Sequence, residues 1–316
     1  MTAVSRVAVI GTGVIGTAWA ALFLARGMDV VASDPAPGAA DRLAHGVRAH
    51  WPGLQRRGVA DGASPDRLTF VTDPAEAAAT ADFVQESGPE RLDVKAALFE
   101  ALDDAAPPDT VLASSSSGLL PSAIQDACLR HPERALVGHP FNPVHLMPLV
   151  EVVPGARTSE RAIEAALALY RAAGKRPVRL HAEVPGHVAN RLQAALWREA
   201  YALVQRGVVS VTDLDAAIAW GPGLRWALLG PLLNQHLSGG DGGLAHVLEH
   251  LGPPMVEWWA DMHRTPDPVL TPELVGTLVD GVAAELAGID QTDVVRQRDE
   301  LLDELLRAKA GRPALP

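Results

Sequence analysis

A histidine and a glutamate twelve positions apart carry the residue types that proton transfer needs in this chain. His139 follows the apolar run 135–137, and Glu151 lies within a second apolar run, 149–153. Imidazole is the side chain whose ordinary pKa lies nearest to neutral pH, so His139 can act as a general base. A neighbouring carboxylate orients such a ring and stabilises its charged form. A turn and a returning strand would set the two side chains next to each other.

Two further polar side chains follow predicted strands and could hold a substrate oxygen. Ser117 ends the serine-rich segment 114–117, and Asn190 comes shortly after Val184-Pro185-Gly186, where a long helix is expected to begin. A base, a hydroxyl and an amide around one oxygen are suited to the oxidation of a secondary alcohol. Because the chain has eleven histidines, the assignment of His139 depends on the glycine loop described next.

A glycine-rich turn near the start of the chain predicts a dinucleotide site. Gly11, Gly13 and Gly16 form a G-x-G-x-x-G motif between a β-branched run, 6–10, and a helical segment, 17–26. In this context the first glycine makes a tight turn, the second lets the backbone approach a pyrophosphate, and the third allows the helix to pack closely on the strand. The pyrophosphate then lies at the helix N-terminus. The loop residues expected to contact the cofactor are Gly11, Thr12, Gly13, Val14, Ile15 and Gly16.

An aspartate at the end of the next predicted strand favours NAD over NADP. Asp34 follows the run 29–33 and lies 23 residues after Gly11. Its carboxylate can accept hydrogen bonds from both ribose hydroxyls of the adenosine half and would repel a 2′-phosphate. The next residues, 35–38, contain no arginine that could bind such a phosphate. The alternative is a Rossmann-like domain that has lost its cofactor.

The elements that must position these residues alternate between strand and helix. Further strands are expected at 68–71, 82–85, 110–113, 135–137, 149–153 and 177–180, and the segment 35–66, interrupted by Pro52, is expected to form two helices. Such alternation predicts right-handed crossovers and a doubly wound parallel sheet. Only helical patterns follow residue 185, at 211–218, 244–250, 272–285 and 293–307. We therefore predict an α/β Rossmann domain over residues 1–184 and an all-α domain over residues 185–316.

Composition limits the class of protein. The 316 residues are 48% apolar and 21% charged, enough to bury a sizeable core. A net charge of −11 without a run of Lys or Arg argues against nucleic acid or an anionic membrane surface as a partner. Cys128 is the single cysteine, and no apolar stretch is long enough to span a bilayer. We expect a soluble, cytoplasmic protein that acts on a small molecule.

The motifs together resemble the 3-hydroxyacyl-CoA dehydrogenase superfamily, nearly from end to end. The resemblance covers the glycine loop, the serine segment 113–119, the histidine motif 138–143 with 149–153, and the helix-opening motif 184–191. One departure is that Ser115-Ser116 stands where the family has Asn-Thr, which leaves the geometry of the serine segment open.

The resemblance implies a role for each matching residue. His139 matches the catalytic base, Glu151 the glutamate paired with it, Ser117 the substrate-contacting serine and Asn190 the active-site asparagine. The family's remaining cofactor contacts fall on Glu90, Lys95 and Asn142. All of the catalytic positions are present, which favours an enzyme over the alternative of a crystallin-like structural protein.

The second half of the chain most closely resembles the L-carnitine 3-dehydrogenase branch of that superfamily, through the segments 221–227, 230–231 and 236–243. Carnitine is a 3-hydroxy acid with a trimethylammonium group, a cation that aromatic faces hold. Trp226 is expected to bind the substrate, and Arg225 to pair with its carboxylate. The other tryptophans of this region are Trp220, Trp258 and Trp259, and at least half of the four are expected in the core or an interface instead.

Other substrates stay open at this point. The L-gulonate 3-dehydrogenases carry Tyr where this chain has Trp226, and they lack its double-glycine repeat. A 3-hydroxyacyl-CoA thioester would need basic residues around its nucleotide, and none cluster in this sequence.

The remaining patterns predict a subunit contact and no metal. His246 and His250 have metal-ligand spacing on a predicted helix, but we expect no metal site because Glu249 is expected on a different face. The segments 231–238 and 294–306 are amphipathic and are expected to pack within the helical domain or against a subunit partner. A homodimer with twofold symmetry is the expected assembly, because related proteins of this architecture dimerise through the helical domain.

Overall fold

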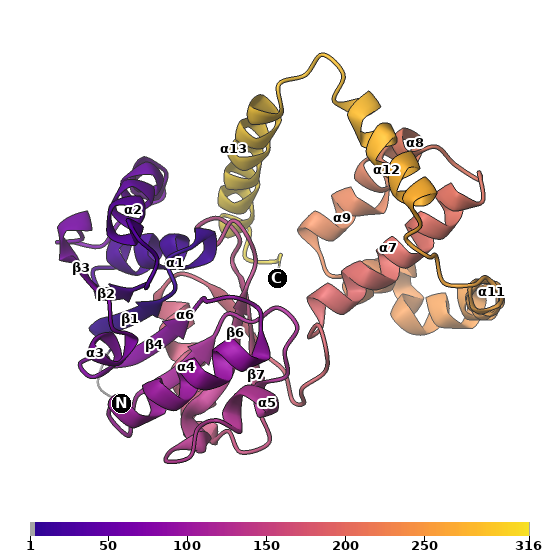
Figure 1. The fold of residues 1–316 in the computed structure, drawn as a ribbon. Coiled ribbons are helices and arrows are strands. Elements are labelled where there is room, and N and C mark those ends of the chain that lie inside the picture. Colours follow the sequence, from indigo (N-terminus) through magenta and orange to yellow (C-terminus); the bar gives the residue numbers. More distant parts are fainter. Residues whose placement is uncertain (1–3, 316) are drawn as a thin grey trace. The chain divides into compact units, whose positions relative to one another are not determined.

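The apolar runs pair into one eight-stranded sheet in the computed structural model, which describes residues 4–315 (Figure 1). The strand order is β3-β2-β1-β4-β5-β6-β7-β8. The first six strands are parallel and have the order of a doubly wound dinucleotide-binding sheet, which confirms the predicted fold class. The strands are β1 (Arg6–Ile10), β2 (Asp29–Ser33), β3 (Leu68–Val71), β4 (Phe83–Glu86), β5 (Val111–Ser114), β6 (Ala135–Pro140), β7 (Leu149–Pro154) and β8 (Arg176–Arg179).

Strand β7 departs from the parallel arrangement. It runs antiparallel to β6, whereas β8 pairs with β7 in parallel. The link over residues 141–148 is shorter than the roughly twelve residues that a parallel crossover needs, so the chain turns back directly. In the resulting register His139 lies opposite Glu151.

Helices cover both faces of this sheet because successive side chains of a strand point to opposite sides. Val7 and Val9 of β1 belong to the apolar cluster under α1, α2 and α6, while Ala8 and Ile10 belong to the cluster under α3, α4 and α5. Strand β1 is thus buried on both faces, as a central parallel strand should be. The helices are α1 (Val14–Ala25), α2 (Ala39–Arg56), α3 (Pro74–Ala78), α4 (Leu92–Ala105), α5 (Pro121–Gln125) and α6 (Glu160–Ala172).

The segment predicted as two helices is one. Helix α2 continues through Pro52 to Arg56, and only a short 3₁₀ turn, Pro65–Arg67, follows before β3. A proline removes one helical hydrogen bond, and here it lies near the end of a helix whose Leu43, Val47 and Leu54 are buried. Packing of the apolar face therefore outweighs the interruption.

The described residues fall into two compact units that divide between Arg191 and Leu192, within α7 (Ala189–Gln205). The rest of the second unit is helical, apart from connecting segments. Among residues 4–315 no helix combines the length and the apolar character that crossing a bilayer requires. The further helices of the second unit are α8 (Val211–Ala219), α9 (Pro222–Leu228), α10 (Pro231–Ser238), α11 (Gly243–Arg264), α12 (Pro272–Glu285) and α13 (Gln291–Ala310).

Candidate active site

The glycine loop between β1 and α1 has a different steric reason for each glycine. Gly11 has a φ of +87°, a conformation that favours glycine, and a Cβ there would meet the backbone of Ser87 and Gly88. A Cβ at Gly16 would overlap the carbonyl oxygen of Gly11, so only glycine lets α1 pack this closely. A Cβ at Gly13 would meet no atom within 4 Å. Gly13 therefore borders open space at the N-terminus of α1.

That helix end fits the pyrophosphate of a dinucleotide. Gly13 is the N-cap of α1, and neither a side-chain cap nor an acidic residue occupies the first turn. The first N–H groups of the helix are thus left for an anion, which the helix dipole also favours. Of the other loop residues, Thr12 is buried, Ile15 is half-buried and Val14 is exposed.

Asp34 is fixed beside this loop. The N–H and the hydroxyl of Thr12 donate to its Oδ2 at 2.8 and 2.9 Å, and the N–H of Ala36 donates to its Oδ1 at 2.9 Å. Burial alone would raise the pKa of Asp34, but these hydrogen bonds lower it below its usual value. The carboxylate is therefore charged at neutral pH, as ribose binding and exclusion of a 2′-phosphate require.

His139 and Glu151 form a buried hydrogen-bonded pair across β6 and β7. The Nδ1 of His139 lies 2.9 Å from Oε2 of Glu151, and the two residues are 4% and 1% exposed. The other carboxylate oxygen accepts the backbone N–H groups of Val188 and Ala189 at 2.9 and 3.0 Å. Although burial raises the pKa of Glu151, the hydrogen bonds from His139 and these two N–H groups lower it below its usual value.

A charged carboxylate at Nδ1 determines which nitrogen of His139 can act as a base. The carboxylate can only accept, so Nδ1 carries the proton and the lone pair is on Nε2. Nε2 has no hydrogen-bond partner within residues 4–315. The arrangement leaves a basic nitrogen that can take a proton from a bound hydroxyl group.

Ser117 and Asn190 meet at the end of β5. The side-chain amide of Asn190 donates to the carbonyl oxygen of Ser117 at 3.1 Å. Ser117 is exposed, and its hydroxyl forms no hydrogen bond in the part of the chain that the structure describes. That hydroxyl is thus available to a ligand, on a loop that Asn190 helps to hold.

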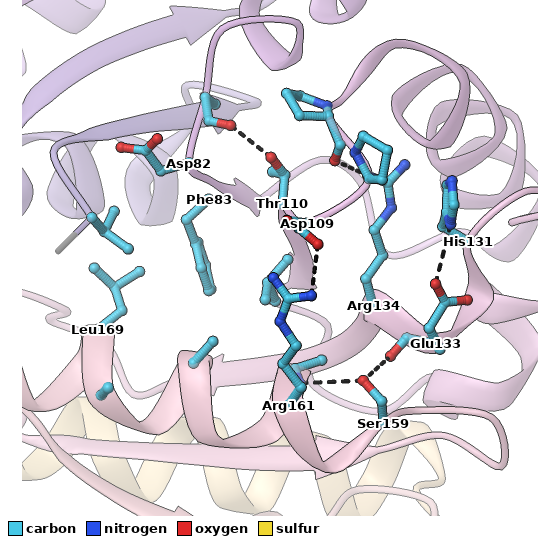
Figure 2. Close-up of a pocket in the computed structure, with 18 of the residues that line it drawn as sticks. Asp82, Phe83, Asp109, Thr110, His131, Glu133, Arg134, Ser159, Arg161 and Leu169 are labelled. Atoms are coloured by element: carbon cyan, nitrogen blue, oxygen red, sulfur yellow. Dashed lines mark hydrogen bonds and ion pairs between the residues drawn. The ribbon is translucent and has the colours of Figure 1, made fainter. Parts of the chain in front are cut away.

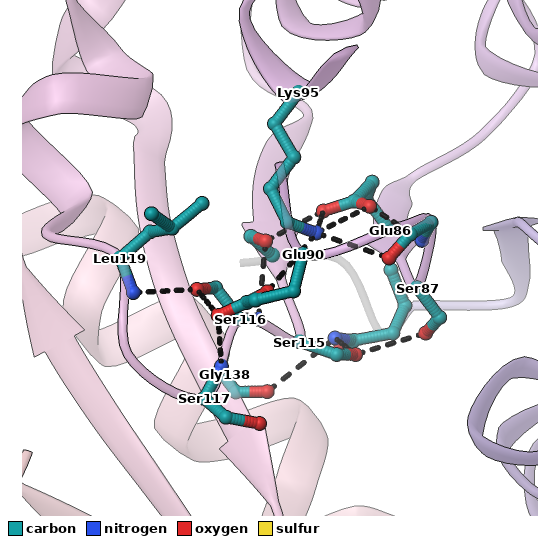
Figure 3. A network of polar contacts seen from close by, with 12 residues as sticks. Glu86, Ser87, Glu90, Lys95, Ser115, Ser116, Ser117, Leu119 and Gly138 are labelled. Atoms are coloured by element: carbon teal, nitrogen blue, oxygen red, sulfur yellow. Dashed lines mark hydrogen bonds and ion pairs between the residues drawn. The ribbon is translucent and has the colours of Figure 1, made fainter. Parts of the chain in front are cut away.

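Glu90 organises the serine loop from the other side (Figure 3). Its Oε1 accepts the hydroxyl of Ser116 at 2.6 Å and the N–H groups of Ser117 and Gly118 at 2.9 Å. Burial opposes ionisation, but the hydrogen bond from Ser116 leads a set of contacts that lower the pKa of Glu90. The carboxylate therefore ties the loop that carries Ser117 to the start of α4.

Lys95, expected at the cofactor, is 1% exposed and lies within an internal ion pair. Its ammonium donates to both oxygens of Glu86, at 2.8 and 2.9 Å, and lies 3.8 Å from Glu90. Ser114, which pairs with Glu86 in the β4–β5 register, also donates to that carboxylate. Glu86 and Ser114 were not predicted as site residues, although both end neighbouring strands.

His187 is a second buried histidine near the site, and it was not predicted from the sequence. It is fully buried, its φ is +53°, and its Nε2 lies 3.1 Å from the carbonyl oxygen of Ser116. Its ring centroid is 5.3 Å from that of His139. Burial lowers the pKa of His187, so the ring is neutral and donates its Nε2–H to Ser116. Its place directly after Gly186 in the helix-opening motif was the available signal.

The remaining predicted site residues make none of these contacts. Asn142 is exposed and precedes a cis peptide bond to Pro143, and its side chain has no hydrogen bond among residues 4–315. Arg225 and Trp226 lie on α9 in the second unit, where both are exposed. Their proposed contact with substrate stays a prediction.

A cavity of about 860 Å³ opens at the opposite edge of the sheet (Figure 2). It is lined by the amino ends of β4 and β5 and by α6, and the Asp109–Arg161 ion pair lies beside it. The strands' carboxyl ends carry His139 and Ser114, so this cavity is separate from the groups that can do chemistry.

The expectation that Glu249 lies on a different face from His246 and His250 is wrong. On α11 the ligand atoms of all three side chains lie within 4.8 Å of one another. Residues three and four positions apart are neighbours on a helix surface, so Glu249 shares the face of both histidines.

Family models match both halves of the chain. The NAD-binding domain of 3-hydroxyacyl-CoA dehydrogenase matches residues 6–184, and the C-terminal domain of the same family matches residues 186–268. An L-carnitine dehydrogenase of Streptomyces griseus is 49% identical over 98% of this chain and 91% of its own length. An L-carnitine dehydrogenase of Pseudomonas putida is 47% identical over 98% of this chain and 95% of its own length.

Solved structures of dehydrogenases are also similar to this chain. The crystal structure of 5-formyl-3-hydroxy-2-methylpyridine 4-carboxylic acid 5-dehydrogenase, an NAD⁺-dependent dismutase, covers 98% of this chain and all of its own, with a TM-score of 0.78 and 29% identity. The 3-hydroxybutyryl-CoA dehydrogenase of Escherichia coli is 33% identical with a TM-score of 0.63, over 78% of this chain and 52% of its own.

Proposed function

The chain belongs to the 3-hydroxyacyl-CoA dehydrogenase family, and from that premise we propose that it oxidises the C3 hydroxyl of L-carnitine to 3-dehydrocarnitine. It is a dehydrogenase that uses NAD. When bound, NAD supplies the acceptor for the hydride that leaves C3. The observation that carries the choice of substrate is the 44–49% identity to L-carnitine dehydrogenases over nearly the whole chain.

The hydrogen bonds around His139 support its role as the base. Glu151 holds the ring in the tautomer with a free Nε2 and stabilises the positive charge that appears once Nε2 takes the C3 hydroxyl proton. The N–H groups of Val188 and Ala189 keep that carboxylate ionised and fixed. Protonated His139 is then paired with a charge of opposite sign in a buried place, where the interaction is strong.

The serine loop supports a role for Ser117 and Asn190 in holding the reacting oxygen. The hydroxyl of Ser117 is free to hydrogen-bond that oxygen, and Asn190 adds an amide donor next to it. Glu90 and His187 fix the loop through three N–H or O–H groups and one carbonyl. A loop that is held in this way needs little rearrangement when substrate binds.

Glu90, Lys95 and Asn142 remain proposed cofactor contacts, together with the glycine loop and Asp34. Of these, Glu90 is partly exposed and Asn142 is exposed, whereas Lys95 is buried and forms an ion pair with Glu86. Arg225 and Trp226 remain the proposed contacts for the carboxylate and the trimethylammonium group of carnitine.

A substrate comparison tests the proposal. NADH formation is measured with L-carnitine, L-gulonate and 3-hydroxybutyryl-CoA side by side at mildly alkaline pH, with the His139→Gln variant as the control for contaminating enzymes. We expect L-carnitine to react fastest and the variant to be nearly inactive. Preference for the sugar acid or the thioester would overturn the substrate and keep the dehydrogenase. No reaction with any of the three would contradict the proposal and favour a structural role.

We also propose that the protein works in the cytoplasm as a homodimer. Its single cysteine, Cys128, is a buried free thiol, which suits a reducing compartment. Several large apolar side chains of the second unit are more than half exposed, and association of two copies would remove such side chains from water. They include Trp220, Leu232, Leu237, Trp258, Trp259 and Leu301.

A further inference from the structure

One turn of α11 presents three side chains that can hold a metal ion. His246, Glu249 and His250 are all exposed, and their ligand atoms lie within 4.8 Å of one another. The two imidazole rings are neighbours, with centroids 4.1 Å apart and planes tilted by 45°. Ligands of a tetrahedral zinc ion lie at about 2.0–2.2 Å from the metal, so rotation of the exposed His246 and Glu249 side chains closes the remaining gap.

The hydrogen bonding of His250 prepares it as a ligand. Its Nδ1 lies 3.0 Å from the carbonyl oxygen of His246, which can only accept, so Nδ1 carries the proton. The lone pair is therefore on Nε2. A metal-binding imidazole typically donates its other N–H to such an acceptor, which fixes both its tautomer and its orientation.

We propose that His246, Glu249 and His250 form a site for a divalent transition-metal ion of the zinc class. Two neutral imidazoles and one carboxylate suit Zn²⁺, Cu²⁺ or Ni²⁺, whereas Mg²⁺ and Ca²⁺ prefer oxygen ligands alone. Three protein ligands leave a position for water. The site lies on a single helix, so it forms without any rearrangement between parts of the chain.

The helix gives this site a structural consequence. Pro253 and Pro254 lie inside α11 and have no N–H to donate, so the carbonyls of Glu249 and His250 lack their usual helical donors. The proposed ligands span the turn just before this gap. A bound ion would link positions 246 and 250 and stabilise a turn that has lost backbone hydrogen bonds.

Titration with metal tests the proposal on the whole protein. Protein freed of metal by a chelator and dialysis is titrated with Zn²⁺ in a calorimeter, and then with Ni²⁺, Cu²⁺ and Mg²⁺. We expect one Zn²⁺ per chain, a higher melting temperature in its presence, and no binding of Mg²⁺. His246→Ala, His250→Ala and Glu249→Gln should each weaken Zn²⁺ binding, the histidine changes by about tenfold or more.

A matched control lies on the same helix. His263 is also an exposed histidine whose Nδ1 contacts a backbone oxygen four residues earlier, that of Trp259, but it is not part of the cluster. His263→Ala should bind Zn²⁺ like the original chain. Absence of Zn²⁺ binding, or equal binding by the His246→Ala/His250→Ala double variant, would overturn the site.

Discussion

His139 can act as a base only in the tautomer that its surroundings impose. Glu151 accepts from Nδ1 through one oxygen and from two backbone N–H groups through the other. Both oxygens of Glu151 therefore accept hydrogen bonds, and these bonds fix the orientation of the carboxylate. The chemistry of the site depends on this orientation as much as on the imidazole.

Replacing the base should abolish turnover and spare cofactor binding. His139→Gln removes the proton acceptor, and general-base catalysis contributes about 10²–10⁴-fold to rates. We expect kcat with L-carnitine to fall by that range while the dissociation constant for NAD, measured by titration, stays unchanged. Turnover near that of the original chain would show that another group accepts the proton.

Replacing the carboxylate should invert the tautomer. In Glu151→Gln the N–H groups of Val188 and Ala189 require the amide oxygen, which turns the amide NH₂ toward Nδ1 of His139. The proton of the imidazole then moves to Nε2, and the free base is lost. We expect kcat to fall by up to about 10⁴-fold, as in a serine protease whose triad aspartate becomes asparagine. A loss below tenfold would contradict the tautomer argument.

The same variant has a predicted pH dependence of stability. The pKa of Glu151 is lowered in the folded state, so its carboxylate adds stability above the unfolded value of about 4.3, and this is lost as pH falls through the folded pKa. Denaturant unfolding should therefore show Glu151→Gln to be less stable than the original chain at pH 7, with a smaller difference toward pH 3. A difference independent of pH would contradict this.

At the scale of elements, the β1–α1 turn contains one glycine expected to matter for cofactor binding and another expected to matter for packing of the fold. A methyl group at Gly13 would enter open space at the end of α1, whereas one at Gly16 would overlap the carbonyl of Gly11. Two substitutions of the same size should therefore have different effects.

Gly13→Ala should weaken NAD binding with little change in the melting temperature, because the added methyl group occupies space the pyrophosphate needs. Gly16→Ala should lower the melting temperature as well, because α1 must move away from β1. Calorimetric titration with NAD and thermal unfolding of both variants measure the two effects. Unchanged NAD affinity in Gly13→Ala would mean that the open space beside Gly13 is not where the cofactor lies. Equal losses of stability would contradict the steric difference between the two positions.

Strands and helices of the first unit follow closely from local patterns. Runs such as 6–10 and 29–33 are apolar enough to be buried on both faces, and β1 and β2 form at those positions. The direction of β7 depends on the length of the link before it. The single helix α2 depends on burial of Leu43 and Val47, which outweighs Pro52.

The polar contacts of the site were less predictable. Lys95 meets Glu86 only because α4 packs beside β4, and Ser114 reaches the same carboxylate only through the register of β4 and β5. The spacing of residues in the sequence does not reveal which strands are neighbours, so these contacts could not be predicted from it. His187 is buried, with a φ of +53°, just before α7, and only its place after Gly186 in the helix-opening motif pointed to it.

At the scale of the molecule, the second unit buries few large apolar side chains. Leu274 and Val247 are buried, but Trp220 is 80% exposed and Leu232 is 67% exposed. Water contact with this much apolar surface is unfavourable, at roughly 25 cal/mol per Å². A second copy of the chain could cover it.

Light scattering after size exclusion should therefore give the mass of two 33.3 kDa chains. The melting temperature should rise with protein concentration, because association stabilises the folded state by mass action. As a control, Leu129→Ser changes an exposed apolar residue of the first unit and should leave the mass unchanged. A monomer at all concentrations would contradict the homodimer.

The β6–β7 hairpin has a consequence for building hybrid enzymes. Base and orienting carboxylate face each other within one contiguous stretch, from Ala135 to Pro154. A crossover point outside this stretch passes both residues to the hybrid with their register intact. An insertion inside it that slips the pairing by one residue would turn Glu151 to the opposite face of the sheet. The hairpin is thus a single piece that can be exchanged between related dehydrogenases without separating the pair.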